Sequence, residues 1–390
     1  MSALYKNYAR SEVAFERGEG VRLFSTTGDE YYDFAGGIAV NVVGHADPHV
    51  VNAIKKQAEN LWHVSNVFTI PEAEKLAQRL VDVSFADMAF FTNSGAEAME
   101  CAIKTARRYF YDLGEPDRYE IITMEGAFHG RTLGTIAAGG NPSYLEGFGP
   151  KAEGFVQVPR GDIDALKKAI TPKTAAILFE PIQGESGINI LDVEFLRDVR
   201  KLCDEHGLLL VLDEIQCGYG RTGKMFAYEW AGIEPDIMAL AKGIGGGFPL
   251  GACLATDKVG SAMVPGTHGS TYGGNPLACT VGNAVFDRVS EEGFLDHVQE
   301  MGKHLAWHLQ QLAQKYPDQI VEIRAKGLMV GIKVSSPVGD VVAALRDAKL
   351  LTVGAGDNVV RMLPPLTVTK DEIDEAIRRM DAGLKSLASA

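Results

Sequence analysis

The feature that most constrains the fold is a series of short apolar runs that alternate with amphipathic segments between residues 70 and 256. The runs are apolar at nearly every position, which is typical of strands buried on both faces of a parallel sheet. The intervening segments repeat apolar residues with helical spacing. The apolar runs are MAFF (88–91), EIITM (120–124), FVQV (155–158), AAILF (175–179), LLLVL (208–212) and DIMAL (236–240), and the helical segments span 71–83, 96–110, 162–170 and 193–207. This pattern predicts an α/β fold whose ligands bind at the carboxyl ends of the strands.

The chain has 390 residues, which is too long for one small core and suggests two domains. After residue 276 the alternation gives way to long helical segments with few strands. Near the other end, residues 21–28 and 30–37 have the pattern of two strands joined by a turn at Gly28-Asp29. We predict a large, mostly parallel-sheet domain over 46–280. The two chain ends, 1–45 and 281–390, are expected to form a smaller α+β domain together.

The composition of the chain excludes several kinds of binding partner and indicates the cellular compartment. The net charge is −13, with 51 acidic against 38 basic residues, and no basic run exceeds two residues, so non-specific nucleic-acid or anionic-membrane binding is not expected. No apolar stretch approaches the length of a membrane span, and the charged first twenty residues do not resemble a signal peptide. The cysteines are widely spaced and never in CxxC, which suggests a reducing compartment. These features predict a cytoplasmic protein. The cysteines are Cys101, Cys203, Cys217, Cys253 and Cys279.

The segment FFTNSGAEAMECAIK (90–104) passes from a strand through a short polar turn into a helix. The free N–H groups of a helix N-terminus, together with the Ser94 hydroxyl and Gly95, can cradle an anion. Alternatively, Ser94 or Asn93 simply caps the helix. The stretch lacks the GxxxxGK[ST] pattern of a nucleotide-binding loop.

The segment LLLVLDEIQCGYGRTG (208–223) ends its apolar strand with Asp213-Glu214. A carboxylate in so apolar a setting is costly unless it pairs with a cation. A metal site of the kind found in nucleotide hydrolases is the competing interpretation, but the chain has no matching phosphate loop. Lys242 follows about one helix-plus-strand unit later, so Asp213 and Lys242 are expected at the ends of neighbouring strands.

The segment LAKGIGGGFPLG (240–251) places Lys242 among glycines between two strand-like runs. A solvated lysine in a surface turn is the simpler explanation of such a stretch taken alone. A phosphate cradle, a buried acid and an enclosed amine together match the needs of a phosphorylated pyridine aldehyde. A Schiff-base lyase without a cofactor would need only the lysine. A nucleotide-binding or scaffold protein is the third alternative, but the chain has neither the GxxxxGK[ST] loop nor a GxGxxG fingerprint immediately after a strand-like run.

Eight segments resemble, in order and spacing, the class III pyridoxal-phosphate aminotransferases. They are DFAGGIAVNVVGH (33–45), TNSGAEAMECAIKTAR (92–107), GAFHGRTLGTIAA (126–138), FEPIQGESGI (179–188), LDEIQCGYGRTGK (212–224), LAKGIGGGFPLGA (240–252), HGSTYGGNPLAC (268–279) and VVRMLPPLT (359–367). The resemblance implies the fold type I of pyridoxal-phosphate transferases, pyridoxal 5'-phosphate as cofactor, and a homodimer with shared active sites.

The resemblance also implies residue roles. Lys242 is expected to form the Schiff base, and Asp213 to keep the pyridine nitrogen protonated. Ser94, Gly95 and Ala96 are expected to hold the phosphate, and Thr271 to reach the phosphate of the other subunit's cofactor. The remaining cofactor residues implied are Phe128, stacked on the ring, Gln216, near the ring hydroxyl, and His129, in a positioning role.

The predicted reaction moves the terminal amine of N2-acetyl-L-ornithine to 2-oxoglutarate. By resemblance, Arg131 and Arg361 bind substrate carboxylates, Glu185 neutralises Arg361 when the donor is bound, and Ser270 helps to hold the substrate. Ornithine aminotransferases carry a tyrosine that meets the free α-amine, where this chain has small or apolar residues around Gly37-Ile38. Succinylornithine, succinyl-diaminopimelate, ornithine and 4-aminobutyrate remain alternative donors.

No metal site is expected. His304 and His308 are spaced i,i+4 in KHLAWHLQ, as in zinc-binding helices, but the segment lacks the acidic residue of the HExxH motif. We therefore predict that they are ordinary residues of a helix face. His45 and His49 are also poor candidates, because the family offers no metal.

Overall fold

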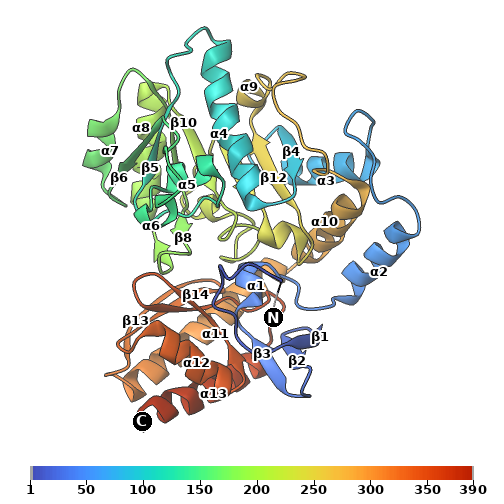
Figure 1. Ribbon diagram of the computed structural model, residues 1–390, viewed down its shortest axis with the longest axis vertical. Helices are drawn as coiled ribbons and strands as arrows, with labels where there is room; N and C mark the ends of the chain where they lie inside the picture. The colour runs from blue at the N-terminus through green and yellow to red at the C-terminus, as the bar shows by residue number, and fades with distance from the viewer. Residues whose placement is uncertain (1–2, 389–390) are drawn as a thin grey trace.

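The computed structural model describes residues 3–388 and shows two parts, each built on its own sheet or sheets (Figure 1). The upper part in Figure 1 contains a seven-stranded sheet with the order β4-β12-β11-β10-β7-β5-β6. Its strands are β4 (Met88–Thr92), β5 (Glu120–Met124), β6 (Phe155–Val158), β7 (Thr174–Phe179), β10 (Leu209–Asp213), β11 (Ile237–Leu240) and β12 (Gly251–Ala255). Only β12 runs antiparallel to its neighbours in this sheet, so the α/β fold with a mostly parallel sheet is confirmed.

The apolar runs are continuous because this sheet is buried on both faces. Leu209 and Val211 of β10 pack into one hydrophobic cluster, while Leu210 and Leu212 pack into another. Helix α4 (Gly95–Asp112) covers the first face and α8 (Val193–His206) lies against β7 and β10 on the other. The other elements of this part are α2 (Pro48–Ala58), α3 (Pro71–Asp82), α5 (Leu133–Gly139), α6 (Pro142–Leu145), α7 (Ile163–Ala169), β8 (Ile182–Gln183), β9 (Asn189–Ile190), α9 (Asp257–Gly260), α10 (Pro276–Val289) and the 3-10 turns η1 (Ala227–Trp230) and η2 (Lys242–Gly245).

The lower part brings together the blue N-terminal and the red C-terminal segments (Figure 1). One four-stranded sheet joins β1, β2 and β3 to β15, and a second has the order β13-β14-β17-β16. The parallel pairing of β3 with β15 links segments more than 300 residues apart in sequence. The elements are β1 (Phe15–Glu19), β2 (Arg22–Ser25), β3 (Glu30–Asp33), α1 (Gly36–Ala39), α11 (Phe294–Lys315), β13 (Ile320–Lys326), β14 (Met329–Val334), α12 (Val338–Asp347), β15 (Leu350–Leu351), β16 (Val353–Ala355), β17 (Val359–Met362) and α13 (Lys370–Ala388).

Helix α10 continues unbroken from 276 to 289 and packs on α2 and α3, so a boundary at residue 280 falls inside a helix. The division into 46–280 and the two chain ends therefore stays a prediction. Within residues 3–388, every helix is too short or too polar to cross a lipid bilayer.

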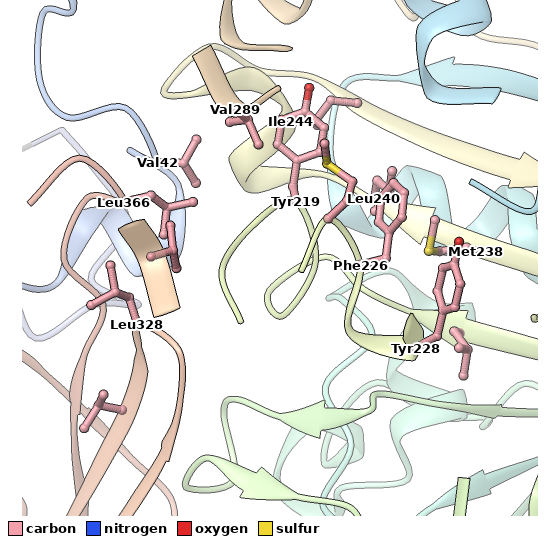
Figure 2. Close-up of a cluster of buried hydrophobic side chains, with 14 of the residues drawn as sticks. Val42, Tyr219, Phe226, Tyr228, Met238, Leu240, Ile244, Val289, Leu328 and Leu366 are labelled. Atoms are coloured by element: carbon pink, nitrogen blue, oxygen red, sulfur yellow. The ribbon is translucent and has the colours of Figure 1, made fainter. Parts of the chain in front are cut away.

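One hydrophobic cluster connects the two parts. Figure 2 shows Val42, Leu328 and Leu366 on one side, facing Tyr219 and Ile244 on the other. The backbone supports this junction, since the Leu366 N–H donates to the Val42 carbonyl at 2.7 Å. Because the interior is close-packed, this junction fixes where the lower part meets the carboxyl ends of the strands above it.

Candidate active site

A cavity of about 410 Å³ opens at the carboxyl ends of the central strands, where an open α/β sheet is expected to bind ligands. It is lined by Val40, Asn93, Ser94, Gly95, Ala96, Phe128, His129, Gly130, Arg131, Glu180, Asp213, Ile215, Gln216, Ala241, Lys242, Gly247, Phe248, Pro249 and Leu250. All the cofactor residues expected from the sequence except Thr271 are in this lining. The cavity therefore unites segments spread over more than 200 residues of chain.

Lys242 enters the cavity from the strand next to that of Asp213, as the spacing predicts. Strand β11 ends at Leu240, and Lys242 follows with a φ of 49°, in the left-handed region. Such a backbone is costly for a residue with a Cβ and points to a site where position is held by the surroundings. Burial lowers the pKa of the Lys242 amine, although the charges of Glu185, Asp213 and Glu180 oppose that effect. The unprotonated amine is the form that attacks an aldehyde, and a lowered pKa makes that form more abundant.

Asp213 is 3% exposed at the end of β10 and is held by two contacts. Its Oδ2 lies 2.8 Å from Nδ1 of His129, and its Oδ1 accepts from the N–H of Ile215 at 3.0 Å. Burial opposes a charged His129 ring, but the hydrogen bond and charge of Asp213 outweigh it and raise the pKa of His129. His129 thereby fixes the orientation of the Asp213 carboxylate, which suits the positioning role expected of it.

Glu180 is a second buried carboxylate that the sequence reasoning missed. It is 5% exposed and accepts from the N–H groups of Phe128 and Gly184 at 2.9 and 3.3 Å. Burial, with the nearby charge of Asp213, raises the pKa of Glu180 to about 7. A signal was present in the sequence, because Glu180 follows the AAILF strand just as Asp213 follows LLLVL.

The turn after β4 confirms that Ser94 caps the helix that follows, while its role in a phosphate cradle stays a prediction. Ser94 is the N-cap of α4, and its Oγ accepts from the Glu97 N–H at 3.2 Å. The next amide, that of Ala98, donates to the Ser94 carbonyl at 3.0 Å. Gly95 and Ala96 line the cavity and belong to the first turn of α4, where helix N–H groups have no intrahelical acceptor. A Cβ at Gly95 would come within 2.9 Å of Ile215, so the backbone lies close to the neighbouring loop.

Arg131 lines the cavity and packs against two aromatic rings. Its guanidinium lies 3.7 Å from the centre of the Tyr144 ring and 5.5 Å from that of Phe128. Such stacking leaves the planar N–H fork of an arginine available for a carboxylate. Nothing in the sequence pointed to Tyr144, which comes from the short helix α6.

Arg361 is 1% exposed on β17 and forms a two-pronged ion pair with Glu185. Arg361 Nη1 and Nη2 donate to Glu185 Oε1 and Oε2 at 2.6 and 3.0 Å. Gln216 lies beside the pair, since its Oε1 accepts from Arg361 at 3.3 Å. Burial opposes the charge of Glu185, but the hydrogen bonds and charge of Arg361 hold its pKa below the ordinary value. Gln216 also lines the cavity, so the pair is one residue away from it.

Ser270 and Thr271 do not line this cavity. Their loop packs against the segment that follows α2, where Asn66 Nδ2 donates to the carbonyls of Ser270 and Gly273 at 3.0 and 2.9 Å. Ser270 Oγ lies 3.4 Å from Nδ2 of Asn93, which does line the cavity. Within one chain, Ser270 therefore approaches the cavity edge and Thr271 is not among its lining residues.

The fold and the site define an aminotransferase of class III. Residues 4–384 match the family described as Aminotransferase class-III, so the chain belongs to that family. It is 60% identical to the acetylornithine aminotransferase of Mesorhizobium japonicum over 100% of this chain and 98% of that one. It is also 60% identical to the acetylornithine aminotransferase of Agrobacterium fabrum, over 99% of this chain and 97% of that one.

Solved structures agree on the fold. The ornithine aminotransferase of Toxoplasma gondii matches with a TM-score of 0.96 and 32% identity, over 100% of this chain and 94% of that one. The N-acetylornithine aminotransferase of Stenotrophomonas maltophilia matches with a TM-score of 0.86 and 37% identity, over 98% of both chains. The structural neighbours thus include enzymes that are named for two different amino donors. The fold alone therefore does not identify the substrate.

The family's cofactor is pyridoxal phosphate, which is described at the active site of a second Toxoplasma gondii ornithine aminotransferase structure. The residues here fit that group. Amides at the start of α4 suit a phosphate, Asp213 suits a protonated ring nitrogen, and Lys242 suits the aldehyde. The buried Nε2 of His129 has no hydrogen-bond partner among residues 3–388, so a polar position in the cavity is left for a ligand.

Proposed function

We propose that this aminotransferase moves the terminal amine of N2-acetyl-L-ornithine to 2-oxoglutarate. The products are N-acetyl-L-glutamate 5-semialdehyde and L-glutamate. The observation that carries the proposal is the Glu185–Arg361 pair beside a cavity that also contains Arg131. A donor with one carboxylate needs one free arginine, whereas a dicarboxylate acceptor needs two.

Each residue of the cavity would have its own role in the reaction. When bound, the cofactor supplies an aldehyde that takes the amine and a ring that accepts electrons. Asp213, held by His129, would keep a proton on the ring nitrogen, and Phe128, which lines the cavity, would pack against the ring. Lys242, which lines the cavity, supplies the amine that would bind the aldehyde of the cofactor. Its Nζ can also take the proton from the amine-bearing carbon of the substrate.

The two arginines would then alternate. Arg131 takes the α-carboxylate of acetylornithine and so directs the distal amine toward Lys242, while Glu185 neutralises Arg361. When glutamate or 2-oxoglutarate binds, Glu185 moves away, Arg361 takes the α-carboxylate and Arg131 takes the distal one. Two-pronged arginine–carboxylate contacts give this exchange its geometric specificity. Ser270, at the cavity edge, would help to hold the substrate.

An acylated donor is favoured by the apolar wall near Val40. This residue lines the cavity and belongs to the segment AGGIAVN, although Gly37 and Ile38 themselves are not in the lining. A free α-amine would remain charged and unpaired against such a wall, whereas an acetamide carries no charge. The relatives at 60% identity are named acetylornithine aminotransferases, which supports the same donor.

An amino-donor panel tests the assignment. Acetylornithine, ornithine, succinylornithine and 4-aminobutyrate are compared as donors with 2-oxoglutarate as acceptor, and kcat/KM is measured for each. Acetylornithine should have the highest value. Equal use of ornithine would contradict the acetylornithine assignment and leave the aminotransferase assignment intact, and a preference for succinylornithine would move the assignment to that donor.

We also propose that the enzyme is a homodimer whose active sites are shared. Large side chains are exposed on the segment after α2 and on the adjoining loop, including Trp62 at 62%, Phe68 at 64% and Tyr272 at 61%. The His63 and Tyr272 rings are 5.1 Å apart, so these segments form one continuous surface. An apolar surface of this kind favours association. Thr271 lies in this surface, where it could reach the cofactor phosphate of the other subunit.

Complementation tests the sharing. Inactive Lys242→Ala chains are mixed with chains of a severely impaired Thr271→Ala variant, and the activity of the heterodimers is measured. Shared sites predict recovery, because one of the two sites then has both functional residues. Heterodimers without any recovery would exclude the role of Thr271.

A cytoplasmic location is part of the proposal, supported by five buried cysteines that are all free thiols.

A further inference from the structure

Two helices of the lower part bring together a group of side chains with the composition of a metal site. His304 and His308 are on α11, and Asp374 is on α13. One nitrogen or oxygen from each side chain lies within 4.8 Å of the others. None of the three residues lines the active-site cavity. The aminotransferase reaction therefore does not explain why they converge.

We propose that His304, His308 and Asp374 form a binding site for a divalent transition-metal cation, with Zn²⁺ as the best match. Two imidazoles and one carboxylate are common ligands of Zn²⁺, and water completes the coordination in open sites. The sequence reasoning expected no metal because the helix segment lacks an acidic residue of its own. The acidic residue is supplied instead by α13, 70 residues away in sequence.

The distances suit an ion of this size. Asp374 Oδ1 lies 2.7 Å from Nε2 of His304 and 3.2 Å from Nε2 of His308. Ligand atoms about 2.0–2.1 Å from a tetrahedral zinc are about 3.3 Å apart. Small side-chain movements therefore convert the group into three ligands around one ion. The i,i+4 spacing keeps both imidazoles on one face of α11 without any change of backbone.

The same contacts converge on one oxygen atom of Asp374. Both Nε2 atoms approach a single carboxylate oxygen, and the two imidazole rings have their centres 4.5 Å apart. A cation accepts the lone pairs of all three groups at once. The histidine side chains are 24% exposed and the aspartate 46%, so an ion can reach the site from solvent.

The expected consequence is a clamp between α11 and α13. The two helices already pack against each other, and Figure 1 shows both in the lower part of the molecule. An ion bound only by the folded chain raises the midpoint of thermal unfolding.

Trp307 provides a direct readout. Its ring centre is 4.6 Å from that of His308, and the side chain is 55% exposed. The holoenzyme is treated with a chelator, freed of it, and titrated with Zn²⁺ while tryptophan fluorescence, calorimetric stoichiometry and the unfolding midpoint are recorded. Titration with Co²⁺ adds a visible spectrum that reports tetrahedral coordination.

The variants are His308→Ala and Asp374→Asn, and the second keeps the shape of the side chain if the first fails to fold. Glu300→Gln is the control, because Glu300 is one turn from His304 and pairs with Lys370 at 2.6 Å without belonging to the group. We expect one saturable Zn²⁺ per chain, binding at least about tenfold weaker in both ligand variants and unchanged in the control. Wild-type affinity in either ligand variant, or no saturable binding to the unaltered enzyme, would overturn the proposal.

Discussion

The Glu185–Arg361 pair gives the sharpest test of how one cavity can serve two different substrates. Replacing Glu185 by Gln removes the carboxylate that holds Arg361 through contacts of 2.6 and 3.0 Å. Arg361 remains buried and keeps its contacts with Gln216 and the Gly354 carbonyl at 3.3 and 3.1 Å. The variant should therefore leave the Arg361 guanidinium without a carboxylate partner beside the cavity.

The magnitude follows from the contacts that an incoming dicarboxylate must replace. A hydrogen bond to a charged group contributes about 1.5–3 kcal/mol. If displacing Glu185 costs about one such bond, its removal should tighten 2-oxoglutarate and glutamate binding by roughly 10- to 100-fold. The acetylornithine half-reaction should become slower, because an unpaired Arg361 competes with Arg131 for the donor's carboxylate.

The assay is single-turnover kinetics of each half-reaction, followed through the absorption of the cofactor. The ratio of the apparent second-order rate constants for glutamate and acetylornithine should rise by at least about tenfold. Glu185→Asp is the control, since it keeps the charge with a shorter reach and should change the ratio less. Equal slowing of both half-reactions, or an unchanged ratio, would refute the gating role of Glu185.

Three further predictions concern groups in the cavity. Lys242→Ala should abolish turnover and leave the cofactor bound without a covalent bond, so near-normal transamination would exclude Lys242 as the Schiff-base residue. Asp213→Asn should retain cofactor but lose on the order of a hundredfold or more in rate, as active sites do on losing a buried electrostatic partner; an unchanged rate would mean that the ring nitrogen has another partner. Glu180 has a pKa of about 7 in the folded protein against an ordinary 4.5, so between these values the folded chain holds a proton that the unfolded chain has released. The free energy of unfolding of the cofactor-free protein, relative to Glu180→Gln, should fall as pH rises from about 4.5 to 7. Denaturant unfolding across that range would measure it, and parallel pH profiles of the two proteins would contradict the raised pKa.

The inner strands of the large sheet were predictable because they are buried on both faces. Burial of this kind requires a run of apolar residues, and such a run is visible in the sequence without any knowledge of its neighbours. Asp213 and Lys242 were predictable for a related reason. Polar groups that directly follow such runs lie at the carboxyl edge of the sheet, where ligands bind.

Residue roles that rest on partners far apart in the chain required the family resemblance or the structure. Glu185 and Arg361 are each ordinary in their own segments, and only their pairing across 176 positions makes them a candidate gate. Tyr144 became relevant only when the fold placed its ring under Arg131. Glu180 was visible in principle, but its raised pKa depends on burial beside Asp213, which the sequence does not report.

The sequence by itself determined the class of fold and the edge of the sheet at which the cavity opens, because these depend on local hydrophobic patterns. The tertiary structure alone decided which side chains share a space. It joined β3 to β15, His129 to Asp213, and the two histidines of α11 to Asp374. The physical reason is that hydrophobic burial is non-directional and can be read locally, whereas hydrogen bonds and ion pairs require atoms within about 3 Å, and that proximity is created only by packing.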